Sequence, residues 1–138
     1  ESEFPLLEMS QGEQGFLLRP SKKGPTVACI SWGFPPLARS LTASVEIAHE
    51  EAFPIEFAVA LIEPKANIEW TADGPSSSAA FSGWTLVRQR HELKEIKVEV
   101  LRLMRRHLDV HCAVRLPSGS YPQPSQTWWR KFIVRWMN

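Results

Sequence analysis

The sequence predicts a β-dominated (α+β) fold, an antiparallel sheet or sandwich of about seven strands with one or two short helices. The first observation is a long apolar stretch, residues 53–70, in which apolar side chains recur at every second position, as they do in strands. The second is a set of further alternating segments, of which 26–32 and 109–116 are the clearest. The third is a content of six Trp and eleven Pro, which favours short strands and shaped loops over long helices.

The length of 138 residues, with 43% hydrophobic and 22% charged residues, is typical of one globular domain. We expect residues 1–15 to form a flexible acidic N-terminal arm and residues 16–138 to form a single globular β-rich domain. The arm contains one apolar cluster, which can pack on its own domain or on a neighbouring molecule. The self-association residues predicted from this cluster are Phe4, Leu6 and Leu7.

The first strands of the globular part are short and are separated by turn residues. Residues 16–18 form a strand, and the Pro-, Lys- and Gly-containing residues 20–25 form a turn. Residues 26–32 form a second strand, in which Cys29 and Ile30 face opposite sides. A Gly-Phe-Pro-Pro sequence then ends this strand, because proline cannot donate to a sheet.

Residues 37–52 fit two patterns, and we predict a helix. Leu37, Leu41 and Val45 begin a helical stripe that continues to Ala52, and the preceding proline stands at a permitted first-turn position. In the strand alternative, apolar residues alternate with Thr, Ser and Glu. The longer stripe favours the helix, whereas the β-branched residues favour the strand.

The central element is a strand at residues 53–62 that is covered on both faces. Its second face carries small or apolar residues apart from Glu56, which is typical of a buried strand. Its first face consists of Ile55, Phe57, Val59 and Leu61. Pro64 ends the strand, and a second short strand begins at 68–70. Residues 73–78 form a loop, which the next five residues extend.

The next segments predict a hairpin. Residues 84–87 form a strand, and residues 89–108 fit either a helical stripe or a strand. The β-branched residues near Val98 favour a strand. We predict that this strand pairs in an antiparallel hairpin with residues 109–116, in which alternate residues face the core, and that residues 104–108 connect the two.

Charge is divided unequally along the chain. Residues 1–83 contain five Lys and Arg against eleven Asp and Glu, whereas residues 84–138 contain eleven against four. One interpretation is a molecule with an acidic and a basic face. The other is that the two halves intermix in the fold and neutralise each other.

The sequence contains no motif specific to catalysis or metal binding. His107, His111 and Cys112 are close in sequence, but a strand places His111 and Cys112 on opposite faces. There is no Gly-rich phosphate loop and no G-x-S-x-G sequence. We therefore predict no catalytic residue, no metal, no cofactor and no enzymatic activity. Because Cys29 and Cys112 are far apart in the sequence, we expect them to be reduced, buried thiols.

The C-terminal part carries most of the basic residues. A loop at residues 117–125 precedes a last strand, residues 127–137, in which basic residues stand among aromatic ones. Cations beside exposed aromatic rings can hold phosphates and stack bases, or contact an anionic membrane surface. Alternatively, the Trp side chains belong to the core and the Arg side chains cover them. The predicted partner- or polyanion-binding residues are Arg102, Arg105, Arg106, Arg115, Trp128, Trp129, Arg130, Lys131 and Arg135.

These features together predict a non-enzymatic protein-interaction or assembly module. It would self-associate as a homo-oligomer, or bind a protein partner, through opposed acidic and basic surfaces, a profile shared by small structural proteins of virions. The alternative is a binding module for nucleic acid or an anionic membrane surface. Because no charged-then-apolar leader and no long apolar run is visible, we expect an intracellular location, cytoplasmic or nuclear.

Overall fold

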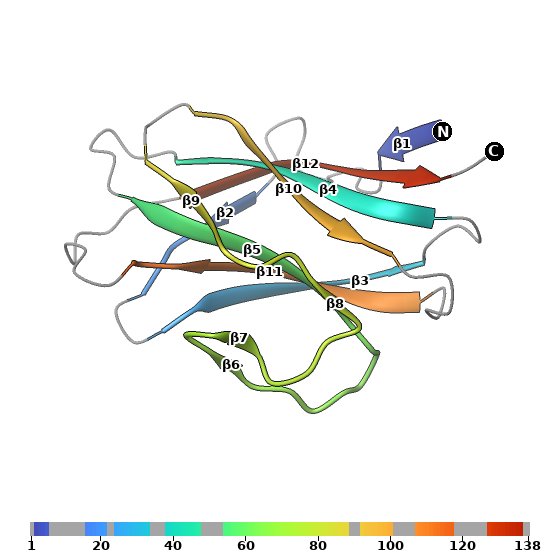
Figure 1. Ribbon diagram of the computed structural model, residues 1–138, viewed down its shortest axis with the longest axis horizontal. Helices are drawn as coiled ribbons and strands as arrows, with labels where there is room; N and C mark the ends of the chain where they lie inside the picture. Colours follow the sequence, from blue (N-terminus) through green and yellow to red (C-terminus); the bar gives the residue numbers. More distant parts are fainter. Residues whose placement is uncertain are drawn as a thin grey trace.

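The protein is a β-sandwich. The computed structural model describes residues 2–5, 16–21, 24–33, 38–47, 54–88, 92–100, 107–117 and 127–136. Two antiparallel sheets pack face to face, and a small hairpin lies beyond the second sheet, on the side away from the first (Figure 1). This arrangement confirms the predicted β-dominated class and selects the sandwich. The one or two predicted helices do not occur among the described residues. These residues therefore contain no helix that is long and apolar enough to cross a membrane.

The first sheet has the strand order β1-β12-β4-β10, with β2 also paired to β12. Each neighbouring pair is antiparallel. The bounds of its strands are β1 Ser2–Pro5, β2 Phe16–Leu18, β4 Ala38–Ile47, β10 Lys94–Glu99 and β12 Thr127–Trp136.

The second sheet has the order β3-β11-β5-β8, with β9 also paired to β5. The remaining two strands, β6 and β7, form the small hairpin. The bounds of these strands are β3 Thr26–Gly33, β5 Ile55–Ile62, β6 Trp70–Thr71, β7 Gly74–Pro75, β8 Ala80–Phe81, β9 Thr85–Val87 and β11 His107–Arg115.

The helix predicted within residues 37–52 is wrong, because its described part is strand β4. β4 lies between β10 and β12 and forms ladders with both. The period of two places Leu41, Ala43, Val45 and Ile47 in the core, where none has any exposed surface. β-branched side chains pack well on a pleated surface, and in this segment that preference prevails over the helical stripe.

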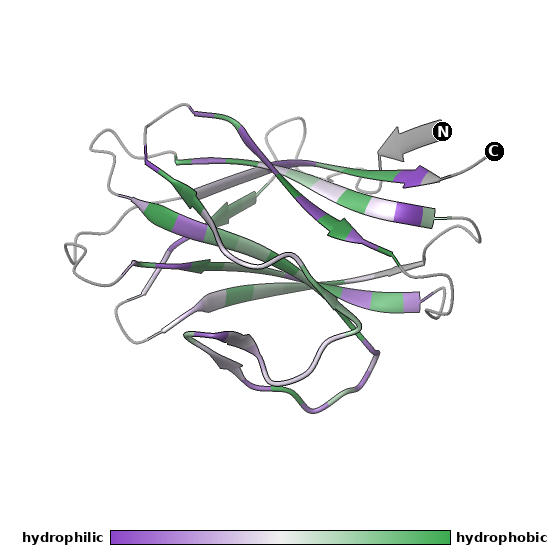
Figure 2. Ribbon diagram, viewed as in Figure 1, coloured by the Kyte–Doolittle hydropathy of each residue, from purple (hydrophilic) through white to green (hydrophobic). Residues whose placement is uncertain are grey.

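Strand β5 is covered on both faces, as predicted. Its core-facing side chains, Ile55, Phe57, Val59 and Leu61, have no exposed surface. Its second face carries Ala58 and Ala60, which are equally buried. Figure 2 shows hydrophobic residues along most of β5, whereas β10 alternates between hydrophilic and hydrophobic. β10 therefore has one face in the core and one in solvent.

The predicted hairpin between residues 89–108 and 109–116 is also wrong. β10 pairs with β4 in the first sheet, and β11 lies between β3 and β5 in the second. Both strands alternate because each buries one face in the same core, but from opposite sides of the sandwich. Local alternation cannot distinguish paired strands from strands that face each other across a core.

Aromatic rings join the two sheets. Trp129 of β12 has no exposed surface and lies 5.7 Å, centroid to centroid, from Phe57 of β5. It also stacks on Phe16 at 6.1 Å with an interplanar angle of 3°. The ring of Trp129, one of the residues predicted to bind a partner, is therefore a central part of the core.

The first residues of the predicted arm belong to the sandwich. Ser2–Pro5 forms β1, which pairs with the C-terminal half of β12, and Phe4 stands opposite Val134 in this ladder. Leu6 and Leu7 lie outside the described residues. The self-association predicted for this cluster stays a prediction.

Candidate ligand-binding cleft

The outer face of the second sheet carries a platform of small residues. Ala58 and Ala60 of β5 and Ala113 of β11 point away from the sandwich core, yet none has any exposed surface. Ala113 is paired with Ala58, and Ala60 with Phe81 of β8. Small side chains leave room for a second layer, and aromatic rings from the segment between β5 and β9 fill it.

This second layer contains three aromatic rings in mutual edge contact. The centroids of Trp70, Phe81 and Trp84 lie 5.9 to 6.2 Å apart, with interplanar angles of 73° to 83°. Edge-to-face pairs of this kind contribute roughly 0.5–1.5 kcal/mol each beyond the area that they bury. The rings are therefore held rigidly on the sheet.

The β6–β7 hairpin positions Trp70. The chain turns back so that Thr71 pairs with Gly74, and the Ser76 hydroxyl accepts a hydrogen bond from the Glu69 amide at 3.0 Å. Gly74 has φ = 122°, and a Cβ atom there would lie only 2.8 Å from the Phe81 ring. Residues 73–78, predicted to be a plain loop, thus contain a hairpin strand packed against an aromatic side chain.

A hydrogen bond fixes the orientation of the Trp70 indole. Its Nε1–H donates to Nδ1 of His111 at 3.0 Å, and the two rings are inclined by only 21°. Because Nδ1 accepts, the proton of the neutral imidazole is on Nε2. Burial lowers the pKa of His111, and the nearby Asp109 carboxylate raises it by less. The imidazole is therefore neutral near pH 7.

A cleft of about 290 Å³ opens beside the Trp70 ring. One wall is the β6 end of the hairpin, and the other is the turn before β3, where Ser21 and Gly24 form an isolated bridge. All described residues that line it are uncharged: Ser21, Gly24, Pro25, Trp70, Thr71 and Ala72. The described lining thus consists of two hydroxyl-bearing side chains, backbone groups and one large ring, and none of these residues carries a charged group.

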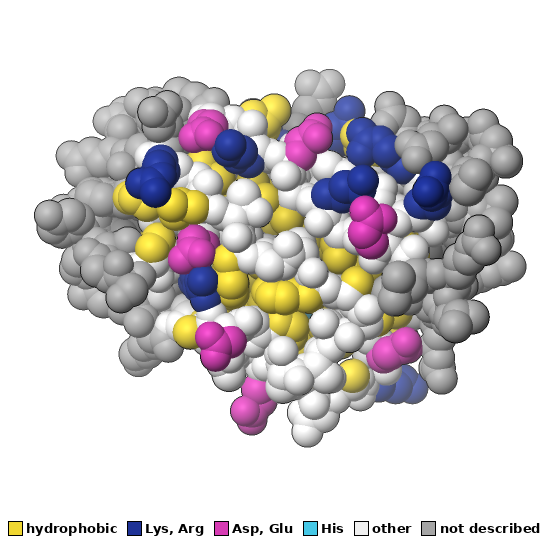
Figure 3. Space-filling model, in the orientation of Figure 1, with side chains coloured by type: hydrophobic (Ala, Val, Ile, Leu, Met, Phe, Trp, Pro, Cys, Tyr) yellow, Lys and Arg dark blue, Asp and Glu magenta, His cyan; other side chains and the backbone are white. Residues whose placement is uncertain are grey.

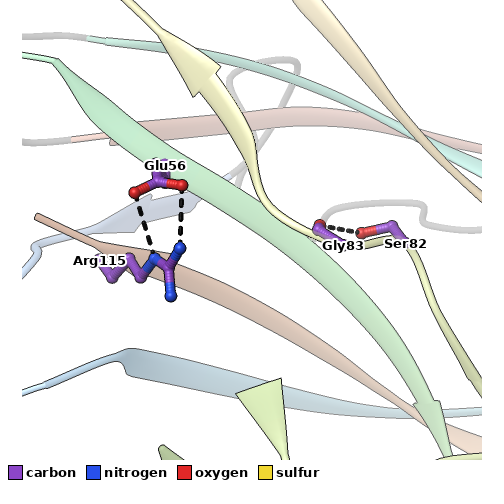
Figure 4. Close-up of polar contacts among 4 residues, drawn as sticks. All are labelled: Glu56, Ser82, Gly83 and Arg115. Atoms are coloured by element: carbon purple, nitrogen blue, oxygen red, sulfur yellow. Dashed lines mark hydrogen bonds and ion pairs between the residues drawn. The ribbon is translucent and has the colours of Figure 1, made fainter. Parts of the chain in front are cut away.

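An ion pair supports the other end of the aromatic layer. Arg115 Nε donates to Glu56 Oε1 at 3.3 Å and Arg115 Nη2 to Glu56 Oε2 at 3.0 Å; Figure 4 shows both bonds as dashed lines between the two labelled side chains. The Arg115 guanidinium carbon lies 4.1 Å from the Trp84 ring centroid. Arg115, which was predicted to bind a polyanion, therefore contacts the Glu56 carboxylate and the Trp84 ring of its own domain.

Residues 1–115 match a protein family described as a family of unknown function, DUF6212. The chain belongs to this family. No curated protein matches the sequence.

Two solved structures are similar to this chain. TmCBM61, a carbohydrate-binding module solved in complex with β-1,4-galactotriose, has a TM-score of 0.52 at 9% identity, with 97% of this chain and 99% of that chain covered. A CocE/NonD family hydrolase from Staphylococcus aureus has a TM-score of 0.49 at 8% identity. The matched region includes 99% of this chain but only 36% of the hydrolase chain. At 9% identity the similarity to TmCBM61 shows the fold alone.

Of the nine residues predicted to bind a partner or polyanion, the six that the structure describes are not brought into one site. Arg102, Arg105 and Arg106 lie outside the described residues, Trp129 is in the core, and Arg115 lies on the second sheet. The other four belong to β12 in the first sheet. There the Arg130 guanidinium pairs with Glu46 and lies 5.2 Å from the Trp128 ring centroid, and Arg135 Nη1 donates to Thr42 Oγ1 at 3.0 Å. Lys131 is exposed.

The acidic and basic halves of the sequence intermix. β4, from the acidic half, lies between β10 and β12 from the basic half. The pairs Glu46–Arg130 and Glu56–Arg115 each join one half to the other. Side chains of both charges are interspersed on the face shown in Figure 3. In these strands, in these ion pairs and on this face, residues of the two halves are therefore mixed.

The sequence-based reasoning missed the residues of the cleft and of the aromatic layer that supports Trp70. Trp70, Phe81 and Trp84 stand in a segment rich in Gly, Ser and Pro, and large aromatic residues in such a segment are a signal of a second layer. The small alanine side chains on the second face of β5 were a second signal, because they leave room for such a layer. Cys29 was predicted to be buried but is exposed, whereas Cys112 is buried as expected.

Proposed function

We propose that this domain is a non-catalytic binding module that takes an uncharged saccharide in the cleft beside Trp70. The observation that carries the proposal is the placement of a rigid indole ring in a cleft whose described lining is entirely uncharged. Pyranose rings present C–H groups on their faces and hydroxyl groups around their edges. An aromatic wall with hydroxyl and backbone groups around it matches both features.

The support of Trp70 suits a binding role. Its N–H is already used by His111, so the ligand would meet the face of the ring and not its polar edge. Phe81 and Trp84 prevent the ring from rotating away. A ring that is ordered before binding loses little conformational entropy when a ligand arrives, and this raises affinity.

The fold is compatible with this role. TmCBM61 has a similar fold and was solved with β-1,4-galactotriose, so the same sandwich can present a saccharide site. Because one fold hosts many functions, the argument for this chain depends on its own cleft.

The experiment is a titration with β-1,4-galactotriose and a glycan array, read by calorimetry and by tryptophan fluorescence. We expect at least a tenfold loss of affinity in Trp70→Ala, since stacking contributes roughly 1–3 kcal/mol per ring by the analogy of base stacking. Ala72→Arg keeps the aromatic layer and should block the cleft, because Ala72 is an exposed lining residue.

Trp128→Ala is the matched control. Trp128 is also a half-buried tryptophan, but it lies on β12 of the opposite sheet. This variant should bind saccharide as the native chain does. The proposal would be overturned if the native domain bound no glycan on the array. It would also be overturned if both Trp70→Ala and Ala72→Arg kept the native affinity.

A second candidate is a protein contact on the outer face of the first sheet, in line with the interaction module predicted from the sequence. Leu17 is 44% exposed and stands opposite Trp128 in the β2–β12 ladder, so the two are cross-strand neighbours, and Lys131 farther along β12 is also exposed. Sedimentation at low and high salt tests self-association. Assembly that is lost in Leu17→Glu would support this candidate, and a monomer at every concentration would reject self-association.

A further inference from the structure

Three side chains with metal-binding atoms meet on the outer face of the second sheet. Cys29 of β3 stands directly opposite His111 of β11, and Asp109 precedes His111 by two residues on the same strand. The thiol, the carboxylate and the imidazole each offer one ligand atom, and these atoms all lie within 4.8 Å of one another. The cluster lies beside the aromatic layer, because His111 also contacts Trp70.

The chemistry of this set fits one class of metal. A thiolate is a poor ligand for Mg²⁺ or Ca²⁺, whereas Cys, His and Asp together suit Zn²⁺. Tetrahedral zinc, with bonds of about 2.0–2.3 Å, holds its ligand atoms roughly 3.3–3.8 Å apart, so small side-chain rotations would close the site. Three protein ligands leave a fourth position for water. Cys29 is exposed, which gives an ion a path of entry.

We propose that Cys29, Asp109 and His111 form a Zn²⁺ site whose occupation releases Trp70 from His111. The same imidazole cannot serve both partners. If the ion binds Nδ1, it displaces the indole N–H directly. If it binds Nε2, the imidazole proton moves to Nδ1, where it faces the indole N–H, and two donors cannot form a hydrogen bond. Zinc binding and the Trp70–His111 bond therefore exclude each other.

The proposal does not depend on saccharide binding, because it can be tested on the domain alone. Zn²⁺ is titrated into the reduced, chelator-treated protein by calorimetry. Co²⁺ serves as a second probe, because thiolate ligation gives it a charge-transfer absorption band. We expect one Zn²⁺ per chain, a thiolate–Co²⁺ band, and a change in tryptophan fluorescence on Zn²⁺ binding.

The ligand variants are Cys29→Ser and Asp109→Asn. We expect Cys29→Ser to abolish the Co²⁺ band and to lower Zn²⁺ affinity at least tenfold, and Asp109→Asn to lower it by less. His107→Gln is the control, because His107 is an exposed histidine on the same strand but is not part of the cluster. Absence of binding to the native domain, or affinity unchanged in Cys29→Ser, would overturn the zinc site.

Trp70→Phe tests the exclusion between the two partners. It keeps an aromatic ring but removes the N–H donor, so zinc no longer competes with a hydrogen bond. Since such a bond contributes about 1 kcal/mol net, Zn²⁺ affinity should rise about fivefold. Equal or lower affinity in Trp70→Phe than in the native domain would refute the release of Trp70. Cys29→Ser in the Trp70→Phe background should again lose the ion, which shows that the same site is measured.

Discussion

Replacement of Gly74 by alanine should destabilise the domain by about 2–6 kcal/mol, through two separate costs. The first is backbone strain: φ is 122° at Gly74, a conformation that L-residues rarely adopt, and such strain costs about 1–3 kcal/mol. The second is a collision, since the new Cβ would lie 2.8 Å from Cε2 and 2.9 Å from Cζ of Phe81. Overpacking of this kind costs about 1–3 kcal/mol.

Gly24 offers a matched control that separates the two costs. Its φ is 141°, but a Cβ atom there would have no heavy atom within 4 Å. Gly24→Ala should therefore show the strain without the collision. The assay is equilibrium unfolding in urea with both variants and the native domain, in which the midpoint should shift at a constant m-value.

Phe81 provides the decisive comparison. In a Phe81→Leu background the ring edge is absent, so Gly74→Ala should lose its collision cost and resemble Gly24→Ala. The coupling free energy between Gly74→Ala and Phe81→Leu should then equal the collision cost, about 1–3 kcal/mol. Equal destabilisation by Gly74→Ala and Gly24→Ala in the native background would refute the view that the hairpin is packed tightly against Phe81.

Two further predictions concern titratable and charged groups. Burial lowers the pKa of His111 in the folded domain. The neutral His111 should therefore contribute fully to stability above about pH 6.5, the pKa of an unfolded histidine. This contribution should be lost as the pH falls through the lowered pKa of the folded state. Urea midpoints of the chelator-treated protein between pH 8 and pH 5 measure this loss, which should be smaller in His111→Gln; identical pH profiles would contradict it. Glu56→Gln should destabilise the domain by about 2 kcal/mol, because it leaves the Arg115 guanidinium, with 23% of its side chain exposed, without its charged partner. Glu99→Gln is the control, since Glu99 and Lys97 form an exposed ion pair. It should lower the free energy of unfolding by less than about 0.5 kcal/mol. Equal losses in the two variants would show that burial does not strengthen the Glu56–Arg115 pair.

The sequence by itself determined where several strands lie and which of their side chains are buried. The alternation of Val110, Cys112 and Val114 with His111 predicted the faces of β11 correctly. The same reasoning held for β5, because two apolar faces are a local property of the residues themselves. Such patterns follow from the period of two in an extended chain, which requires no knowledge of the neighbouring strands.

Only the tertiary structure decided which strands pair and what gathers on their outer faces. Trp70 and His111 are 41 residues apart, yet one hydrogen bond joins them. Cys29 meets His111 because β3 and β11 are neighbours, and no local pattern in either strand predicts that pairing. Ladder hydrogen bonds use backbone groups, which are the same in every residue except proline. Strand order is therefore set by the mutual burial of distant side chains, and the cleft exists only once that order is established.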